Sequence, residues 1–108
     1  MEKKIFELHA EVCKMLAQPL RLEILYHLGE KELSVKELTE KTGARLANVS
    51  QHLALMRQRG IVAARKDGVK VYYCVANKKT LEAFELMREV LLDRLKASKG
   101  LAESMSEM

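Results

Sequence analysis

The strongest constraint on this 108-residue chain is a change in the spacing of its apolar residues at Gly60. Before Gly60 they recur every three or four positions, which is typical of amphipathic helices. After it, residues 61–65 and 69–75 are rich in β-branched and aromatic side chains, with an Asp-Gly pair between them. An Asp-Gly pair flanked by such runs indicates a β-hairpin. The sequence therefore predicts a mostly helical protein with one hairpin.

Five helices are predicted around this hairpin. Apolar spacing and terminal signals give the ranges 3–17, 19–28, 34–41, 45–59 and 78–97. Ser34 and Glu37 have the spacing of a capping box, which marks the start of the third helix. A turn at Gly43 separates the third helix from the fourth, as in a helix-turn-helix, and the following hairpin can act as a wing. This order predicts a mostly α winged helix-turn-helix fold.

The first and last predicted helices carry more apolar residues than one small core can use. A chain of this length buries a modest fraction of its surface, so burial across a dimer interface would add stability. We therefore expect one domain at residues 1–97 that forms a homodimer through helices 3–17 and 78–97. The polar tail at 98–108 is expected to be frayed.

Positive charge is concentrated in one third of the chain. Over the whole chain, Lys and Arg number 19 against 15 Asp and Glu, a net charge of +4. Residues 36–70 hold eight of the cations and three of the anions, so this segment carries +5 and the rest carries −1. A concentrated basic segment favours a polyanionic partner such as nucleic acid. Taken alone, the charge is explained equally well by a solvated surface with chance clustering.

The fourth predicted helix has a polar side that could enter the major groove of DNA. Val49, Leu53 and Met56 share the side expected to face the core, which leaves the other side exposed. Asn and Gln can contact adenine, Arg can contact guanine, and Ala can pack on a thymine methyl group. Ser and basic side chains suit phosphates, and the wing can reach flanking phosphates. We predict DNA contacts from Arg45, Ala47, Asn48, Ser50, Gln51, Arg57, Arg65, Lys66 and Lys70.

The histidine within this helix allows two interpretations. His52 directly follows Gln51, so it could contact a base or bind a ligand. A histidine at such a position is more often half-buried and hydrogen-bonded to the backbone, and we expect that here.

Three segments resemble ArsR-type repressors. They are residues 49–62 (VSQHLALMRQRGIV), residues 17–25 (AQPLRLEIL) and the hairpin end at Tyr72 and Tyr73. The resemblance covers roughly residues 5–95. It implies a winged-helix homodimer, joined through its first and last helices, that blocks promoters and releases DNA when an inducer binds. Arg45 departs from the pattern, because the family usually has Ser or a similar cap there. A cation cannot cap a helix, so the side chain is freer to meet DNA.

The resemblance also implies where an inducer would bind, and this chain lacks those ligands. The best-known family site is a Cys-x-Cys pair within ELCVCDL, and the matching stretch here is ELSVKEL at residues 32–38. Ser34 and Lys36 replace both cysteines, and soft metals and arsenite need thiolates. A second family site uses Asp and His along the last helix, but no histidine follows His52, and Asp93 alone is not a site. We expect neither a metal site nor a cofactor.

Two thiols, Cys13 and Cys74, leave the identity of the inducer open. His9 and Cys13 lie four positions apart on one helix face, but two ligands are too few for zinc unless a partner subunit completes the set. A redox or persulfide switch at either cysteine is a second hypothesis. The third is that both are packing residues. Two cysteines do not make a disulfide framework, so we expect free thiols.

Enzymes and membrane proteins are disfavoured by what the sequence lacks. It contains no Gly-rich phosphate loop, no nucleophile–base arrangement and no metal triad. No apolar run approaches the ~20 residues that span a bilayer. No signal-peptide core follows Met1, so a cytoplasmic location is expected. We predict a transcriptional regulator that binds double-stranded operator DNA. The alternative is a winged-helix module for protein interaction, which the basic segment and the Asn48/Gln51 pair argue against.

Overall fold

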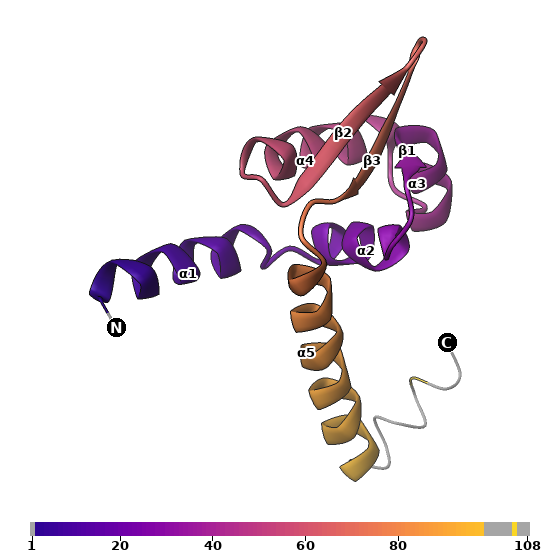
Figure 1. Ribbon diagram of the computed structural model, residues 1–108. Helices are drawn as coiled ribbons and strands as arrows, with labels where there is room; N and C mark the ends of the chain where they lie inside the picture. The colour runs from indigo at the N-terminus through magenta and orange to yellow at the C-terminus, as the bar shows by residue number, and fades with distance from the viewer. Residues whose placement is uncertain (1, 99–104, 106–108) are drawn as a thin grey trace. The chain divides into compact units, whose positions relative to one another are not determined.

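The computed structural model describes residues 2–98 and residue 105 of the chain (Figure 1). The elements are α1 (Lys3–Met15), α2 (Pro19–Leu28), β1 (Leu33–Ser34), α3 (Val35–Thr42), α4 (Leu46–Gln58), β2 (Val62–Asp67), β3 (Lys70–Val75) and α5 (Lys78–Ala97). The five predicted helices and the hairpin are confirmed, with ends within two residues of the predicted ones. Apart from residues 98 and 105, the tail that we expected to be frayed lies outside the described residues.

The chain divides into two compact units, Met1–Asn77 and Lys78–Met108. The first unit holds α1 to α4 and the three strands, and the second holds α5. None of the helices in the described part is both long and apolar enough to cross a membrane.

The helix boundaries in the first unit have local causes. Pro19 occupies the first turn of α2, where its missing N–H costs no hydrogen bond. The predicted capping box is present at α3: the backbone N–H of Glu37 donates to Ser34 Oγ at 3.1 Å, and the backbone N–H of Ser34 donates to Glu37 Oε1 at 3.0 Å. Gly43 ends α3 with a left-handed φ of 72°, which favours glycine. These signals hold α3 and α4 as two separate helices.

The strands form one antiparallel sheet in the order β1-β3-β2. The two-residue strand β1 was not predicted, and it pairs with β3 just before α3 begins. The hairpin turn differs in detail from the prediction. Asp67 still pairs with Lys70, so the two central turn residues are Gly68 and Val69 rather than the Asp-Gly pair. Gly68 has a φ of 63°, as expected for glycine at the first central position of a tight hairpin turn.

One hydrophobic core holds α2, α3, α4 and the sheet together. Its most buried side chains, with at most 2% of their surface exposed, include Leu25 and Leu28 of α2, Leu38 of α3, Leu53 of α4 and Val62 of β2. Burying side chains of this size stabilises a fold by roughly 1.5–3 kcal/mol each relative to leaving them exposed. The core therefore fixes α4 against α2 and α3, while the hairpin extends beyond the helices (Figure 1).

Helix α1 takes no part in this core. None of its thirteen residues is buried, although the following Leu16 is. Its surface carries four exposed large apolar side chains: Ile5, Phe6, Leu8 and Val12. In the second unit, α5 also exposes large apolar side chains, namely Leu86, Met87, Val90, Leu91 and Leu92.

Candidate nucleic-acid interface

Helix α4 packs one side against the core, so its opposite side, which is largely polar, faces solvent. Val49, Leu53 and Met56 are each 0% exposed. At about 100° of rotation per residue, Ala47 and Gln51 lie roughly opposite them, and both are exposed. Helix α4 begins after Arg45, whose side chain makes no capping hydrogen bond, so it remains exposed at the start of the helix.

The remaining polar residues of α4 divide between its two flanks. Ser50 lies on the flank that faces α3 and the wing. Asn48 lies about 160° around the helix from Ser50, on the same flank as His52. The predicted contact residues Asn48 and Ser50 are both exposed, and so is Arg57 in the last turn. Asn48 and Ser50 therefore lie at opposite edges of the exposed side of α4, with Ala47 and Gln51 between them.

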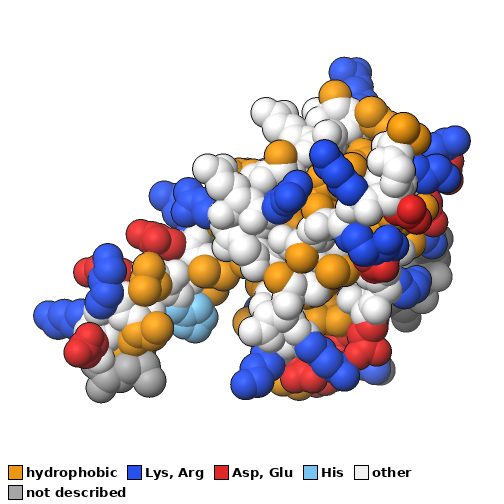
Figure 2. Space-filling model, turned by 45° about the horizontal axis from the view of Figure 1, so that its top comes forward, with side chains coloured by type: hydrophobic (Ala, Val, Ile, Leu, Met, Phe, Trp, Pro, Cys, Tyr) orange, Lys and Arg blue, Asp and Glu red, His pale blue; other side chains and the backbone are white. Residues whose placement is uncertain are grey.

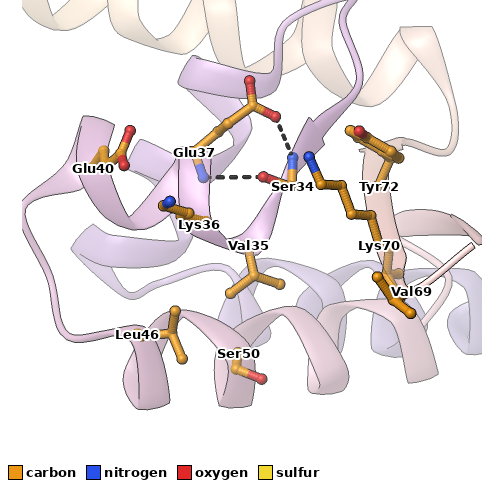
Figure 3. Close-up of a pocket in the computed structure, with 11 residues that line it drawn as sticks. Ser34, Val35, Lys36, Glu37, Glu40, Leu46, Ser50, Val69, Lys70 and Tyr72 are labelled. Atoms are coloured by element: carbon orange, nitrogen blue, oxygen red, sulfur yellow. Dashed lines mark hydrogen bonds between the residues drawn. The ribbon is translucent and has the colours of Figure 1, made fainter. Parts of the chain in front are cut away.

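A pocket of about 650 Å³ lies between α3, the first half of α4 and β3 (Figure 3). Val35 of α3 and Leu46 of α4 project toward one another into this space. Two lysines line it, Lys36 from the first turn of α3 and Lys70 from the wing, together with Ser50. Two basic groups and a hydroxyl around a concave surface suit a phosphate group of a nucleic-acid backbone.

Lys36 was not among the predicted contact residues. The sequence placed it within the basic segment and as the replacement for a metal-binding cysteine. Lys36 and Lys70 are 34 positions apart, and only the pairing of β1 with β3 brings the start of α3 next to the wing. Short-range sequence patterns carry no information on that pairing. The useful signal was the position of Lys36 at the start of a capped helix, where anions are favoured.

Two acidic residues, Glu37 and Glu40, also line the pocket, and the carboxylate of Glu37 is engaged in the cap of α3. The pKa of Glu37 is lowered, first by the hydrogen bond from the Ser34 backbone N–H and then by the Ser34 hydroxyl, with smaller contributions from Lys70 and Lys41. The Glu37 carboxylate therefore acts as part of the helix cap. Lys70 runs from β3 toward this cap (Figure 3), and it remains exposed.

The wing carries exposed cations at its tip. Lys66 and Lys70 are both exposed near the turn. Val69, which lies between Gly68 and Lys70, is 100% exposed. Figure 2 shows lysine and arginine side chains (blue) spread over this face, with hydrophobic side chains between them. A protruding tip with basic groups on both strands has the geometry of a wing that reaches a nucleic-acid backbone.

Arg65, another predicted contact, is engaged within the protein. Its Nε donates to Glu32 Oε2 at 3.0 Å and its Nη2 donates to Glu32 Oε1 at 3.3 Å. The guanidinium also lies 5.2 Å from the ring centroid of Tyr72. The carboxylate of Glu32 raises the pKa of Arg65 above its ordinary value. Because the ion pair is exposed, it contributes little to stability, and a phosphate could displace it.

His52 is half-buried, as predicted, but its predicted hydrogen bond to the backbone is wrong. Its Nδ1 instead accepts a hydrogen bond at 2.9 Å from Nε of Arg21, a buried residue of α2. The prediction failed because the two residues are 31 positions apart and meet only when α2 packs against α4.

The two cysteines lie in different surroundings. Cys13 is exposed on α1, as is His9. Cys74 is half-buried on β3, and the strand register puts it on the same face as Ala63, away from buried Val62. Across residues 2–98 and 105, no three His, Cys, Asp or Glu side chains are grouped so that they could hold a metal ion.

Comparison with known proteins identifies close sequence and fold relatives. A family model described as bacterial regulatory protein, arsR family, matches residues 18–64. HTH-type transcriptional regulator Rv0081 of Mycobacterium tuberculosis is 40% identical over 88 residues, which cover 81% of this chain and 77% of that protein. Its crystal structure matches with a TM-score of 0.78 and 37% identity, over 90% of this chain and 98% of that one.

Two further relatives extend this comparison. HTH-type transcriptional regulator KmtR of M. tuberculosis is 37% identical over 83 residues, which cover 77% of this chain but 58% of KmtR. The solution structure of the homodimeric winged helix-turn-helix DNA-binding domain of Mb0332 from Mycobacterium bovis matches with a TM-score of 0.75 and 29% identity. That match covers 90% of this chain and 93% of the Mb0332 domain.

Proposed function

This chain belongs to the ArsR family of bacterial transcriptional regulators, and we propose that it binds operator DNA as a homodimer through α4 and the β2–β3 wing. Regulators of this kind are not enzymes. The observation that carries the proposal is the exposed polar side of α4, held by the core beside a pocket that two lysines line and a wing with exposed lysines near its tip. A binding function of this kind belongs in the cytoplasm, where bacterial DNA lies.

Base recognition is assigned to the first half of α4. The major groove of B-DNA admits one helix, and its base edges are distinguishable by hydrogen bonding. Gln51 and Ala47 lie roughly opposite the core, so they point most directly at base edges when α4 lies in the groove. Arg45 at the start of the helix can reach a guanine. Asn48, on the flank near α2, is assigned a base contact at the edge of the groove.

Phosphate binding is assigned to the pocket and the wing. Lys36, Ser50 and Lys70 surround the pocket, and a DNA strand alongside α4 would pass its backbone over this concavity. Lys66 near the wing tip and Arg57 in the last turn of α4 supply further phosphate contacts. Contacts of this type position the protein on DNA and contribute affinity, but they do not select a sequence.

A homodimer explains the exposed apolar side chains of α1 and α5. The related Mb0332 domain is homodimeric. Ile5, Phe6, Leu8 and Val12 of α1 remain exposed in a single chain, and covering them would remove apolar surface from water. A two-fold dimer would present two α4 helices to half-sites about one helical turn of DNA apart.

Repression with release by an inducer is the regulatory mode that we propose. No thiolate pair is present at Ser34 and Lys36, so thiol chemistry, if the inducer uses it, is that of Cys13 and Cys74. Exposed Cys13 is the more accessible of the two to a sulfur oxidant or a persulfide donor. Because Cys13 lies on α1, a change there would alter the dimer and thereby the spacing of the two α4 helices.

The test is a selection of duplexes from a randomised DNA pool, followed by binding titrations at low and high salt. Wild-type protein should enrich a two-fold symmetric sequence and bind it more tightly than unselected DNA at every salt concentration. Its affinity for both should fall steeply as salt rises, because phosphate contacts release counterions. Enrichment of no sequence, with weak binding that is insensitive to salt, would favour the alternative of a protein-interaction module.

A further inference from the structure

Arg21 is the one buried charged side chain among residues 2–98 and 105, with 9% of its surface exposed. Burying a guanidinium is costly unless its donors are satisfied by hydrogen bonds. Arg21 lies in α2, behind the surface proposed to bind DNA, so it cannot be explained as a phosphate contact. The free-energy cost of burying Arg21 must therefore be offset by its hydrogen bonds.

Two hydrogen bonds of Arg21 join three helices. Its Nε donates to Nδ1 of His52 in the middle of α4 at 2.9 Å. Its Nη1 donates to the backbone oxygen of Met15, the last residue of α1. Carbonyl groups at the end of a helix lack partners within the helix and carry partial negative charge, so a buried cation is well placed there. Arg21 therefore connects the end of α1 to the centre of α4.

This arrangement requires a neutral imidazole. Nδ1 of His52 can accept a hydrogen bond only if it carries a lone pair, so the proton must be on Nε2. A second proton would remove the acceptor and bring two cations to hydrogen-bond distance. The charged group that faces His52 is Arg21 of α2, while the end of α1 faces the pair with a backbone carbonyl. In agreement, burial and then the charge of Arg21 lower the pKa of His52 below its ordinary value of 6.5.

We propose that Arg21 and His52 are positioning residues for DNA recognition: the core packs α4 against α2, and the hydrogen bond between Arg21 and His52 sets the exact placement of α4 relative to α2 and the end of α1 only while His52 is neutral. This inference rests on the proposed function, in which α4 enters the major groove. His52 directly follows Gln51, so a shift of α4 at this point moves the proposed base contact. The link to α1 also connects the proposed dimer helix with the helix that recognises DNA.

The test compares histidine variants at about pH 7.5 and about pH 5.5. Fluorescence anisotropy would measure their binding to a duplex that wild-type protein has selected from a randomised pool. His52→Asn keeps an oxygen acceptor near the position of Nδ1 but does not titrate. His52→Leu fills the space of the imidazole without an acceptor, so Nε of Arg21 loses its partner while Nη1 keeps its hydrogen bond to Met15. His9→Asn removes an exposed histidine of α1 and is the matched control.

We expect the variants to depend on pH in different ways. Wild type and His9→Asn should lose roughly five- to tenfold in affinity at the lower pH, the effect of losing one hydrogen bond. His52→Asn should bind at the higher pH within about twofold of wild type and lose much less at the lower pH. His52→Leu should bind weakly at both pH values. Acid weakening of His52→Asn equal to that of wild type would overturn the proposal.

A second measurement needs neither DNA nor a folded leucine variant. The nitrogen chemical shifts of His52 in free wild-type protein report its tautomer, and we expect the Nε2–H form with an acceptor at Nδ1. A proton on Nδ1 at neutral pH would contradict the hydrogen bond and overturn the proposal. If the expected tautomer is found but wild type binds no duplex at either pH, the failure lies in the proposed DNA-binding function, and the positioning role falls with it.

Discussion

Helices α1 and α4 have the same length, thirteen residues each, but the molecule uses them in opposite ways. Helix α4 buries Val49, Leu53 and Met56 in the core of its own chain and presents a largely polar side to solvent. Helix α1 buries none and leaves large apolar side chains exposed. A helix with a satisfied apolar side can serve as a rigid support for polar recognition, whereas α1 gains stability only from a second surface. This difference suits α4 to recognising DNA and α1 to assembling the dimer.

The largest expected effect is a loss of folding stability, and it comes from the side chains that α4 packs into the core. Leu53→Ala removes a side chain with no exposed surface and should lower the free energy of unfolding by roughly 2–5 kcal/mol. Leu8→Ala on α1 is the matched control, because Leu8 is exposed in the single chain. Urea denaturation at low protein concentration would compare them. Equal losses for the two variants would contradict the contrast between the helices.

The next effect concerns assembly. Val12→Asp places a charge on the exposed apolar surface of α1 and should weaken dimerisation by on the order of 2–4 kcal/mol, as expected for a central interface residue. Sedimentation would show a monomer at micromolar concentration where wild type is dimeric, with an unchanged circular dichroism spectrum. Glu11→Asp is the control for a local change that adds no charge. A monomeric wild type would refute the proposed homodimer.

A smaller effect, on DNA affinity, is expected from removing the lysines that line the pocket. Lys36→Ala and Lys70→Ala should each weaken selected and random DNA alike and reduce the salt slope by about one. Lys41→Ala, at the other end of α3, changes charge equally and is the control. Binding titrations over a range of salt concentrations would measure the slopes. If Lys41→Ala has the same effect as Lys36→Ala, the pocket has no special role.

The smallest expected effect is that of metals. Zinc, cadmium and arsenite at modest excess should leave the protein bound to DNA, because Ser34 and Lys36 provide no thiolates. Release by cadmium in a variant lacking both Cys13 and Cys74 would reveal a metal site elsewhere.

A sulfur oxidant or persulfide donor should release wild type from DNA but not Cys13→Ser, and a reductant should reverse the release. Insensitivity of wild type to every thiol reagent would leave both cysteines as packing residues.

Local signals were sufficient to predict the helices and the hairpin, but not the contacts between residues far apart in the sequence. Pro19, the capping box at Ser34 and the glycine turns act within a few residues, so the sequence located the helices and the hairpin. Strand β1 was missed because two residues carry no periodicity. The hydrogen bonds of Arg21 with His52 and of Arg65 with Glu32 join residues 31 and 33 positions apart. Such pairs depend on tertiary packing, which residue spacing does not encode.

The same limit applies within the candidate site. Sequence spacing identified the exposed side of α4, because three core residues define its opposite side. It did not separate the two flanks, since that requires knowing which neighbour each flank faces. Ser50 faces the pocket beside the wing, whereas His52 faces Arg21 of α2. Packing against α2 and the wing therefore decides which polar residues remain available to DNA.

Base recognition by the first half of α4 is best tested by comparing Gln51→Ala with Gln58→Ala. Both residues are exposed on the same side of α4, about two turns apart, so the substitutions are chemically identical. Affinities for a selected duplex and for random DNA would be measured at one salt concentration. Gln51→Ala should reduce the preference for the selected duplex by roughly 1–3 kcal/mol, and Gln58→Ala should leave it unchanged. Equal weakening of both duplexes by Gln51→Ala would contradict the account.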